Sequence, residues 1–182
     1  ESLRQSAFQV VSLITTTGFA TVDTNLWTPF AIVLLIFVSI VCACAGSTSG
    51  GLKVDRLLLF AKQLVARIKR QQHPNAVIRI RVDGVVQESE QLNGVVVFVV
   101  TYLIIVLVAT VVNTMFSQDL MTSFSSAVAC MGNVGPGFGA VGSLDNYAQM
   151  PLILKLQASL LMLMGRLEIF GFIQLFFLKW WR

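Results

Sequence analysis

The amino-acid sequence predicts an all-α membrane protein with one small β-hairpin on its cytoplasmic side. Hydrophobic residues make up 55% of the 182 residues and charged residues only 12%, and the mean hydropathy is +0.78, well above the balance of soluble domains. A helix needs about 20 apolar residues to cross a bilayer, and Val95 to Phe116 provides one uninterrupted run of that length. Two further candidates, Phe30 to Ala45 and Leu152 to Leu178, are interrupted by glycines or charges.

The basic residues indicate the orientation in the membrane. Eight of the thirteen Lys and Arg residues lie between Lys53 and Arg81, and such clusters mark the cytoplasmic side. The connecting segments that contain Asp23, Asp119 and Asp145 have no Lys or Arg, so we expect them to face outside. A nucleic-acid-binding patch is the alternative interpretation of the basic run. Its position directly between membrane segments favours orientation instead.

The residues of common catalytic and metal sites are scarce. Cys42, Cys44 and Cys130 have apolar neighbours and are expected to be small core residues. The single histidine, His73, lies in the basic loop, so a His-dependent triad or a multi-histidine metal site has little raw material. A nucleophile paired with a base, or a pair of membrane carboxylates, is also missing. We therefore expect no enzyme activity and no covalently bound cofactor.

The first part of the chain reads as a short helix, a polar turn and a membrane helix. Ser2 to Leu13 has apolar residues at helical spacing but is too short to cross a bilayer. The polar turn Ile14 to Thr21 follows it. Trp27 then suits a membrane interface and Pro29 a helix start, so a long apolar helix is expected over Phe30 to Ala45.

The next segment is expected on the cytoplasmic side. Three glycines and three hydroxyl residues in Gly46 to Gly51 favour a break in the helix. The chain continues as the basic amphipathic segment Lys53 to Arg70. The alternation around Asp83-Gly84 then predicts a two-residue hairpin turn. The cross-strand pairs expected from that turn are Val82 with Val85 and Arg79 with Glu88.

The second part of the chain repeats the order of the first. After the span that begins at Val95, the segment Asp119 to Met131 is again a short, half-apolar helix. A glycine-rich turn, Gly132 to Gly139, follows it. After Pro151 a last apolar helix begins, and Gly165-Arg166 is expected to interrupt it. Each membrane helix thus carries an interruption at nearly the same distance from its turn.

The register between the two copies is approximate. Gly18 can be matched with Gly135, but Gly137-Phe138 could equally be set against Gly18-Phe19. The first copy also lacks a leading membrane span, which suggests that the chain was cut from something longer.

The two glycine turns are candidates for binding a cation. Non-helical backbone at membrane depth is tolerated only where it is buried in protein or lines a water-filled cavity. Backbone carbonyls can replace the hydration shell of K⁺, glycine permits the positive φ that aims them, and helix C-termini add partial negative charge. Neither turn contains a carboxylate, so monovalent cations fit better than divalent ones. Ordinary interfacial loops are the alternative interpretation.

Four motifs, ITTTGFAT, AGSTSGGLK, GNVGPGFG and GRLEIF, resemble in their order the C-terminal half of the Trk/Ktr/HKT superfamily of potassium transporters, most closely the bacterial TrkH type. The resemblance covers essentially the whole chain. It implies four non-identical helix, pore-loop, helix repeats around a central ion pathway. Residues 1–72 would form the third repeat without its first helix, residues 73–93 a cytoplasmic linker with the hairpin, and residues 94–182 the fourth repeat.

The resemblance also assigns roles to residues of three motifs. It implies a K⁺ filter made only of backbone carbonyls, with no side-chain metal ligand, and an intramembrane gating loop beneath it. The filter carbonyls would belong to Thr16, Thr17, Gly18, Phe19, Asn133, Val134, Gly135 and Pro136. The gate would consist of Gly46, Ser47, Thr48, Ser49, Gly50, Gly51 and Arg166. A glycine-rich helix contact is the alternative interpretation of the loop.

Arg166 is the charged residue that most needs an explanation. An arginine in the centre of a membrane helix costs at least ~2.5 kcal/mol and normally faces protein or water. We expect it to face the pore, where its charge hinders K⁺ and its donors can bind the gating loop, as the resemblance implies. A structural ion pair is the alternative. Glu168 is two residues away, on another side of the helix, so its partner should lie on a neighbouring helix or be a main-chain amide.

The function that the resemblance implies is potassium uptake across the bacterial inner membrane, with K⁺ as the substrate. The alternative is a secondary transporter of a small solute, built on broken helices. The resemblance further implies a homodimer and cytoplasmic nucleotide-binding regulatory subunits of the TrkA/KtrA kind, which would alone bind nucleotide. These subunits would contact Lys53 to Glu90. Residues 53–93 are expected to be cytoplasmic, and the filter turns are expected to face outside. Membrane lipid and the N-terminal half of the polypeptide are the other expected partners, and nucleic acid is not. Selectivity between K⁺ and Na⁺, and coupling to H⁺ or Na⁺, stay open.

Overall fold

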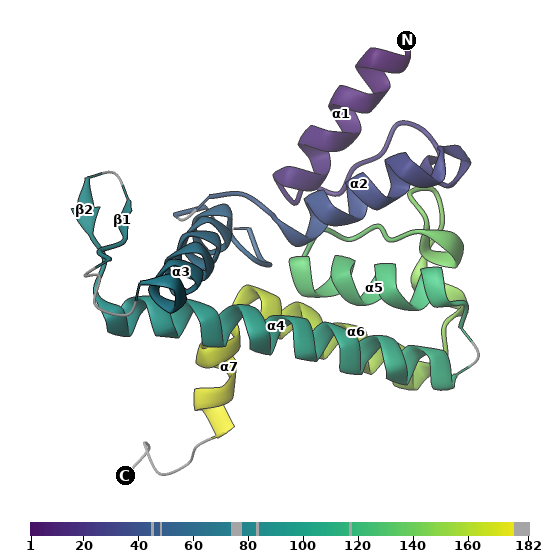
Figure 1. Cartoon of the computed structure of the whole chain (residues 1–182). Helices are drawn as coiled ribbons and strands as arrows, with labels where there is room; N and C mark the ends of the chain where they lie inside the picture. Colours follow the sequence, from purple (N-terminus) through teal and green to yellow (C-terminus); the bar gives the residue numbers. More distant parts are fainter. Residues whose placement is uncertain (45, 48, 74–77, 83, 117, 177–182) are drawn as a thin grey trace.

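The computed structural model describes residues 1–44, 46–47, 49–73, 78–82, 84–116 and 118–176. Over these residues the chain forms seven α-helices, three short 3-10 turns and one hairpin (Figure 1). The helices are α1 (Ser2–Ile14), α2 (Pro29–Ile40), α3 (Val54–Gln72), α4 (Ser89–Met115), α5 (Leu120–Gly132), α6 (Leu152–Arg166) and α7 (Ile169–Phe176). The 3-10 turns are η1 (Thr24–Leu26), η2 (Gly139–Val141) and η3 (Tyr147–Gln149), and the strands are β1 (Arg81–Val82) and β2 (Val85–Val86). The predicted all-α fold with a small hairpin is therefore confirmed.

Helix α4 is the longest element. Its part Glu90–Met115 contains an 18-residue stretch with a mean hydropathy of 3.1 and is the one helix in the described ranges that is long and apolar enough to cross a membrane. The long apolar helix predicted over Val95 to Phe116 is thus confirmed, but it begins earlier, at Ser89, and ends at Met115. Glu90 lies in the first turn, where a negative charge interacts favourably with the helix dipole and stabilises the helix.

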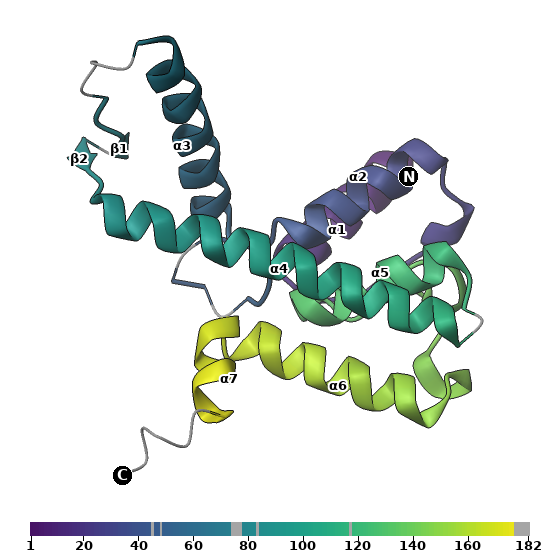
Figure 2. The same cartoon turned by 60° about the horizontal axis from the view of Figure 1, so that its bottom comes forward.

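Helix α5 lies at the centre of the fold. It packs against α4, α6 and α2, which cover it on several sides (Figures 1 and 2). All its residues from Thr122 to Gly132 are buried except the half-buried Phe124. The side chain of Asp119 caps the first turn by accepting a hydrogen bond from the Met121 amide at 3.2 Å. A short helix with buried hydroxyl residues is therefore shielded by longer apolar ones.

Helix α1 has the same length as α5 but a different environment. It packs on α2, and only Gln9, Ser12 and Leu13 of its residues are buried. Leu3 and Val11 are more than half exposed. The apolar face of α1 is therefore mostly uncovered in this chain.

The predicted apolar helix over Phe30 to Ala45 was too long, because α2 ends at Ile40. Val41 leaves the helical conformation with φ −96° and ψ 64°. The chain then folds back, so that the amide of Leu52 donates to the carbonyl of Ile40 at 3.2 Å. The thiol of Cys42 also bonds the Ser39 carbonyl at 3.0 Å. These contacts satisfy backbone groups at the end of α2. The helix breaks at Val41, earlier than the break predicted at Gly46 to Gly51.

The predicted interruption at Gly165-Arg166 was also misplaced. Both residues are helical, and the chain leaves the helix at Leu167 and Glu168, where Glu168 has a φ of 59°. Gly165 serves close packing instead of helix breaking. A Cβ atom there would clash with the Met131 carbonyl oxygen, so only glycine lets α6 approach the end of α5 this closely.

The segments that were predicted to be cytoplasmic have the secondary structure expected from the sequence. The hairpin pairs Val82 with Val85, as predicted, and Arg81 with Val86. Each strand has only two residues, so the predicted pair of Arg79 and Glu88 lies beyond the ladder. Asp83 lies outside the described residues. Lys62 of α3 donates to the Arg81 carbonyl at 2.9 Å and ties the hairpin to that helix.

Candidate functional site

The turns that follow α1 and α5 have positive φ angles at matching positions. Thr16 and Asn133 both have a φ of 54°, and Gly18 and Gly135, two residues later, have φ values of 76° and 107°. A left-handed threonine is unusual because its Cβ is branched. The pattern matches Gly18 with Gly135 and does not follow the register that sets Gly137-Phe138 against Gly18-Phe19.

The hydrogen bonds that end the two helices also match. Each helix ends in a Schellman motif, in which the left-handed residue bonds three positions back and the next residue bonds five positions back. In the first turn the Thr16 amide donates to the Leu13 carbonyl at 3.1 Å, and the Thr17 amide donates to the Ser12 carbonyl at 2.9 Å. In the second turn the Asn133 amide donates to the Cys130 carbonyl at 3.1 Å, and the Val134 amide donates to the Ala129 carbonyl at 2.9 Å. Both turns are therefore placed at the partially negative end of a helix.

The two turns touch each other. A Cβ atom on Gly18 would clash with the Val134 carbonyl oxygen and would lie 3.2 Å from Cδ of Pro136. Val134 itself is buried in a cluster that includes Leu13 of α1. Phe19, by contrast, is 71% exposed. The predicted filter residues from the two halves of the chain thus lie side by side, with one flank of the first turn open.

The loops after the two turns are tied together. The side-chain amide of Asn25 donates to the Gly139 carbonyl at 3.1 Å and accepts from the Gly139 amide at 2.9 Å. The Thr24 amide donates to the Ser143 hydroxyl at 3.0 Å, which in turn donates to the Val22 carbonyl at 3.0 Å. These four bonds hold the relative position of the turns.

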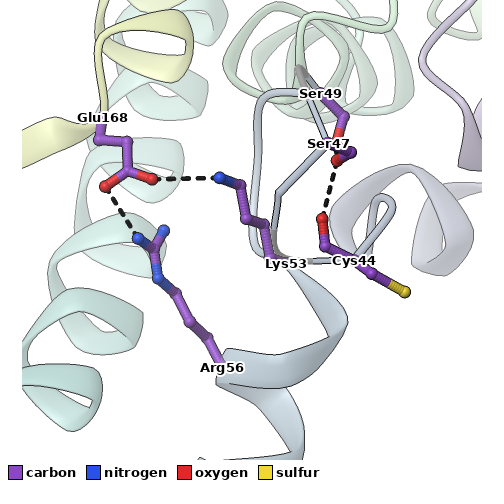
Figure 3. A network of polar contacts seen from close by, with 6 residues as sticks. All are labelled: Cys44, Ser47, Ser49, Lys53, Arg56 and Glu168. Atoms are coloured by element: carbon purple, nitrogen blue, oxygen red, sulfur yellow. Dashed lines mark hydrogen bonds and ion pairs between the residues drawn. The ribbon is translucent and has the colours of Figure 1, made fainter. Parts of the chain in front are cut away.

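The predicted gating loop is irregular in the structure. Gly46 and Gly51 have φ values of 85° and 73°, and Thr48 lies outside the described residues. The Ser47 hydroxyl donates to the Cys44 carbonyl at 2.8 Å and bonds the Ser49 hydroxyl (Figure 3). The described part of the loop is not helical, so a glycine-rich helix contact does not explain this motif.

The loop lies against the second turn. A Cβ atom on Gly50 would lie 2.8 Å from Nδ2 of Asn133 and 2.9 Å from the Gly132 carbonyl oxygen. The same Nδ2 donates to the Met162 carbonyl of α6 at 3.0 Å. Asn133 thus contacts the loop and the last helix at once.

Arg166 and the loop line the same cavity, which has a volume of about 240 Å³. Ser47, Ser49 and Gly51 form the loop side of the cavity, and Tyr102 of α4 is also part of its wall. The predicted gating arginine and the described residues of the predicted gating loop therefore line one cavity.

Glu168 lies at the edge of this cavity and forms two ion pairs. Its carboxylate accepts from Nζ of Lys53 at 3.2 Å and from Nη2 of Arg56 at 2.8 Å (Figure 3). The Arg56 guanidinium also lies 4.0 Å from the centre of the Phe98 ring. A partner on a neighbouring helix was predicted for Glu168 and is confirmed. The sequence prediction assigns Lys53 and Arg56 a role in membrane orientation only.

The three cysteines follow the prediction only in part. Cys42 and Cys130 are buried as predicted, whereas Cys44 is exposed because it lies in the irregular loop after α2.

Tyr147 was expected only as part of an outer loop. Its hydroxyl donates to the Gly135 carbonyl at 3.0 Å. Across the described ranges, no three His, Cys, Asp or Glu side chains form a candidate metal site.

Comparisons with known proteins agree with each other. A family profile described as "TrkH: Cation transport protein" matches residues 1–180. The Trk system potassium uptake protein TrkH of Salmonella typhimurium is 40% identical over 181 residues, and that of Escherichia coli K12 is 39% identical. The match covers all of this chain but 37% of either relative, so the chain spans little more than a third of their length.

A solved structure gives the same result. The crystal structure of the potassium transporter TrkH from Vibrio parahaemolyticus superposes with a TM-score of 0.86 at 36% sequence identity. The alignment covers 98% of this chain and 38% of that one. The similarity therefore includes the arrangement of the helices as well as the sequence.

Proposed function

Since its whole length matches, the chain belongs to the TrkH family of cation transport proteins, and we propose that it is part of a protein that takes up potassium ions across the bacterial inner membrane. The relatives named above are potassium uptake proteins. The observation that carries the proposal is the contact between two turns of matching backbone conformation.

The proposed filter consists of the carbonyls of the two turns. Carbonyl oxygens can replace the water that K⁺ loses, and the C-termini of α1 and α5 add partial negative charge at the same place. The matching φ values at Thr16 and Asn133 and at Gly18 and Gly135 support a common role. The proposal covers the carbonyls of residues 16–19 and 133–136.

Two turns form only part of a ring around an ion. We propose that two further units of the same polypeptide complete it. The contrast between α5, with ten buried residues, and α1, with three, supports this arrangement, because a helix of the same role should be equally enclosed. The exposed Phe19 also leaves a flank for a neighbouring unit.

The proposed gate is the loop of residues 46–51 together with Arg166. Its shared cavity with Arg166 supports this assignment. A positive charge there raises the barrier to a passing cation. The glycines of the loop permit a second backbone conformation, and movement of the loop away from the pathway would let K⁺ pass.

The proposed orientation places residues 53–93 in the cytoplasm and the filter turns toward the outside. The basic helix α3 and the hairpin would then face cytoplasmic regulatory subunits, which alone would bind nucleotide. The names of the relatives, which refer to a Trk system, support partners of this kind. A homodimer with one pore in each subunit is part of the same proposal.

Rubidium uptake into proteoliposomes tests the function. The full-length protein that contains this sequence should take up radioactive rubidium, and external K⁺ should inhibit the uptake whereas amino acids and sugars should not. Inhibition by an organic solute, or uptake of that solute without K⁺, would instead favour a secondary transporter of small solutes.

A further inference from the structure

Tyr147 contacts the second turn from outside the turn itself. It belongs to η3, and its hydroxyl donates to the Gly135 carbonyl oxygen at 3.0 Å. The thiol of Cys130, on α5, lies 3.7 Å from the same hydroxyl and donates to it. The ring packs against the buried side chains of Val141 and Met150. The hydroxyl is thus held by a fixed ring and by a second donor.

The hydroxyl of Tyr147 is a permanent donor. Burial raises the pKa of Tyr147 far above its usual range, so the phenol stays protonated. A carbonyl oxygen has two lone pairs. The bond to Tyr147 therefore uses one acceptor site of Gly135 and fixes the direction of this carbonyl.

Among the residues that the structure describes, no side chain bonds the Gly18 carbonyl, which is the matching position of the first turn. There the Ser12 hydroxyl bonds the carbonyl of Phe19, the residue after Gly18, at 2.6 Å. Gly18 and Gly135 match in backbone conformation. The two turns are therefore alike in their main chain but differ in which carbonyl a side chain holds.

We propose that Tyr147 is a specificity-determining positioning residue, whose hydroxyl fixes the Gly135 carbonyl and thereby disfavours Na⁺ against K⁺. The inference rests on the proposed function. A dehydrated Na⁺ ion is smaller, so the surrounding carbonyls must move inward to contact it. A carbonyl oxygen that also accepts a hydrogen bond on its second lone pair is tethered to the donor and resists that movement, whereas it already suits the larger ion.

The test uses Tyr147→Phe in the full-length protein, reconstituted in proteoliposomes. The phenyl ring still fills the same space, so only the hydroxyl is lost, with its bond to Gly135 and its weak contact with the Cys130 thiol. Inhibition of rubidium uptake by K⁺ and by Na⁺ is measured, and the ratio of the two inhibition constants gives the preference. We expect the preference for K⁺ to fall roughly three- to tenfold, the change that one ordinary hydrogen bond makes. An unchanged ratio would overturn the proposal.

Asn146→Ala is the matched control. Asn146 caps the same short turn by accepting a hydrogen bond from the Ala148 amide at 2.9 Å, without touching Gly135. This variant should keep the wild-type ratio, and an equal loss of preference would overturn the proposal by showing that any loosening of the loop suffices.

Thermal melting would reveal whether Tyr147→Phe folds poorly. In that case a second variant tests the proposal. Incorporation of 3-fluorotyrosine at position 147 keeps the shape and makes the hydroxyl a stronger donor. It should raise the K⁺ preference, and a wild-type ratio would contradict the proposal. A wild-type protein without K⁺-inhibited uptake would refute the proposed function itself. A selective wild type with unaltered variants would refute only the role of Tyr147.

Discussion

The carboxylate of Glu168 accepts a hydrogen bond from the guanidinium of Arg56 at 2.8 Å, although 112 positions separate the two residues in the sequence. Glu168 lies at the break between α6 and α7, two residues after Arg166, and Arg56 lies in the first turn of α3. The ion pair therefore joins the basic helix α3 to the segment that carries the proposed gating arginine. The electrostatic balance of the cavity depends on both residues.

Neutralising Glu168 should reduce ion flux. In Glu168→Gln the positive charges of Lys53 and Arg56 lose their partner at the edge of the cavity, and the barrier to a cation rises. Rubidium uptake by the full-length protein should fall several-fold, and less so at high concentrations of choline chloride, which screens the charges. The side chain of Glu168 is 46% exposed, so stability should change by no more than about 1 kcal/mol.

Glu90→Gln is the control for this variant, because Glu90 is an exposed carboxylate in the first turn of α4. It should leave the uptake rate unchanged. Faster or unaltered uptake in Glu168→Gln would show that its charge does not act on the ion pathway.

Removing the charge of Arg166 should have the opposite effect. Arg166→Ala should raise rubidium uptake several-fold, because the proposed gating cation, which lines the same cavity as Ser47 and Ser49, would no longer repel K⁺. Arg166→Lys keeps the charge and should stay close to the wild-type rate. Equal rates in wild type and Arg166→Ala would remove this residue from the gate.

Gly18→Ala should abolish uptake. The new Cβ would clash with the Val134 carbonyl oxygen and would also need a φ of 76°, so the two turns could no longer touch. Gly84→Ala is the matched control, because it has a similar φ of 81° but nothing within 4 Å of its Cβ position. It should cost about 1 to 2 kcal/mol of local strain and leave uptake intact. Full uptake in Gly18→Ala would mean that the contact between the turns is dispensable.

The link between the outer loops should contribute to stability. Asn25→Ala removes both hydrogen bonds to Gly139 and should lower the free energy of unfolding by about 1 to 3 kcal/mol. Asn25→Asp keeps the acceptor for the Gly139 amide and should have an intermediate effect. Denaturant unfolding of the full-length protein in detergent measures both. Wild-type stability of Asn25→Ala would show that this link does not hold the turns in place.

Local patterns predicted much of the fold. The apolar run after Val95 predicts a long helix, and Asp83-Gly84 predicts the hairpin register in which Val82 pairs with Val85. Both follow from residues that are near each other in the sequence. Elements of this kind depend little on the rest of the chain.

Contacts between distant segments explain what the sequence could not predict. Gly165 suggests a helix break, but it is a packing position whose reason is the Met131 carbonyl of another helix. The end of α2 depends on Leu52 returning to bond Ile40. The left-handed conformation of Thr16 is contrary to its intrinsic preference. The bond from Tyr147 to Gly135 likewise gives no local signal.

The central claim is that the carbonyls of both turns contact the transported ion. Anomalous diffraction from crystals of the full-length protein grown in rubidium chloride tests it most directly. We expect a rubidium peak in contact with carbonyl oxygens of residues 16–19 and of residues 133–136 at once. A map in which the ion occupies other sites while both turns stay empty would contradict the account.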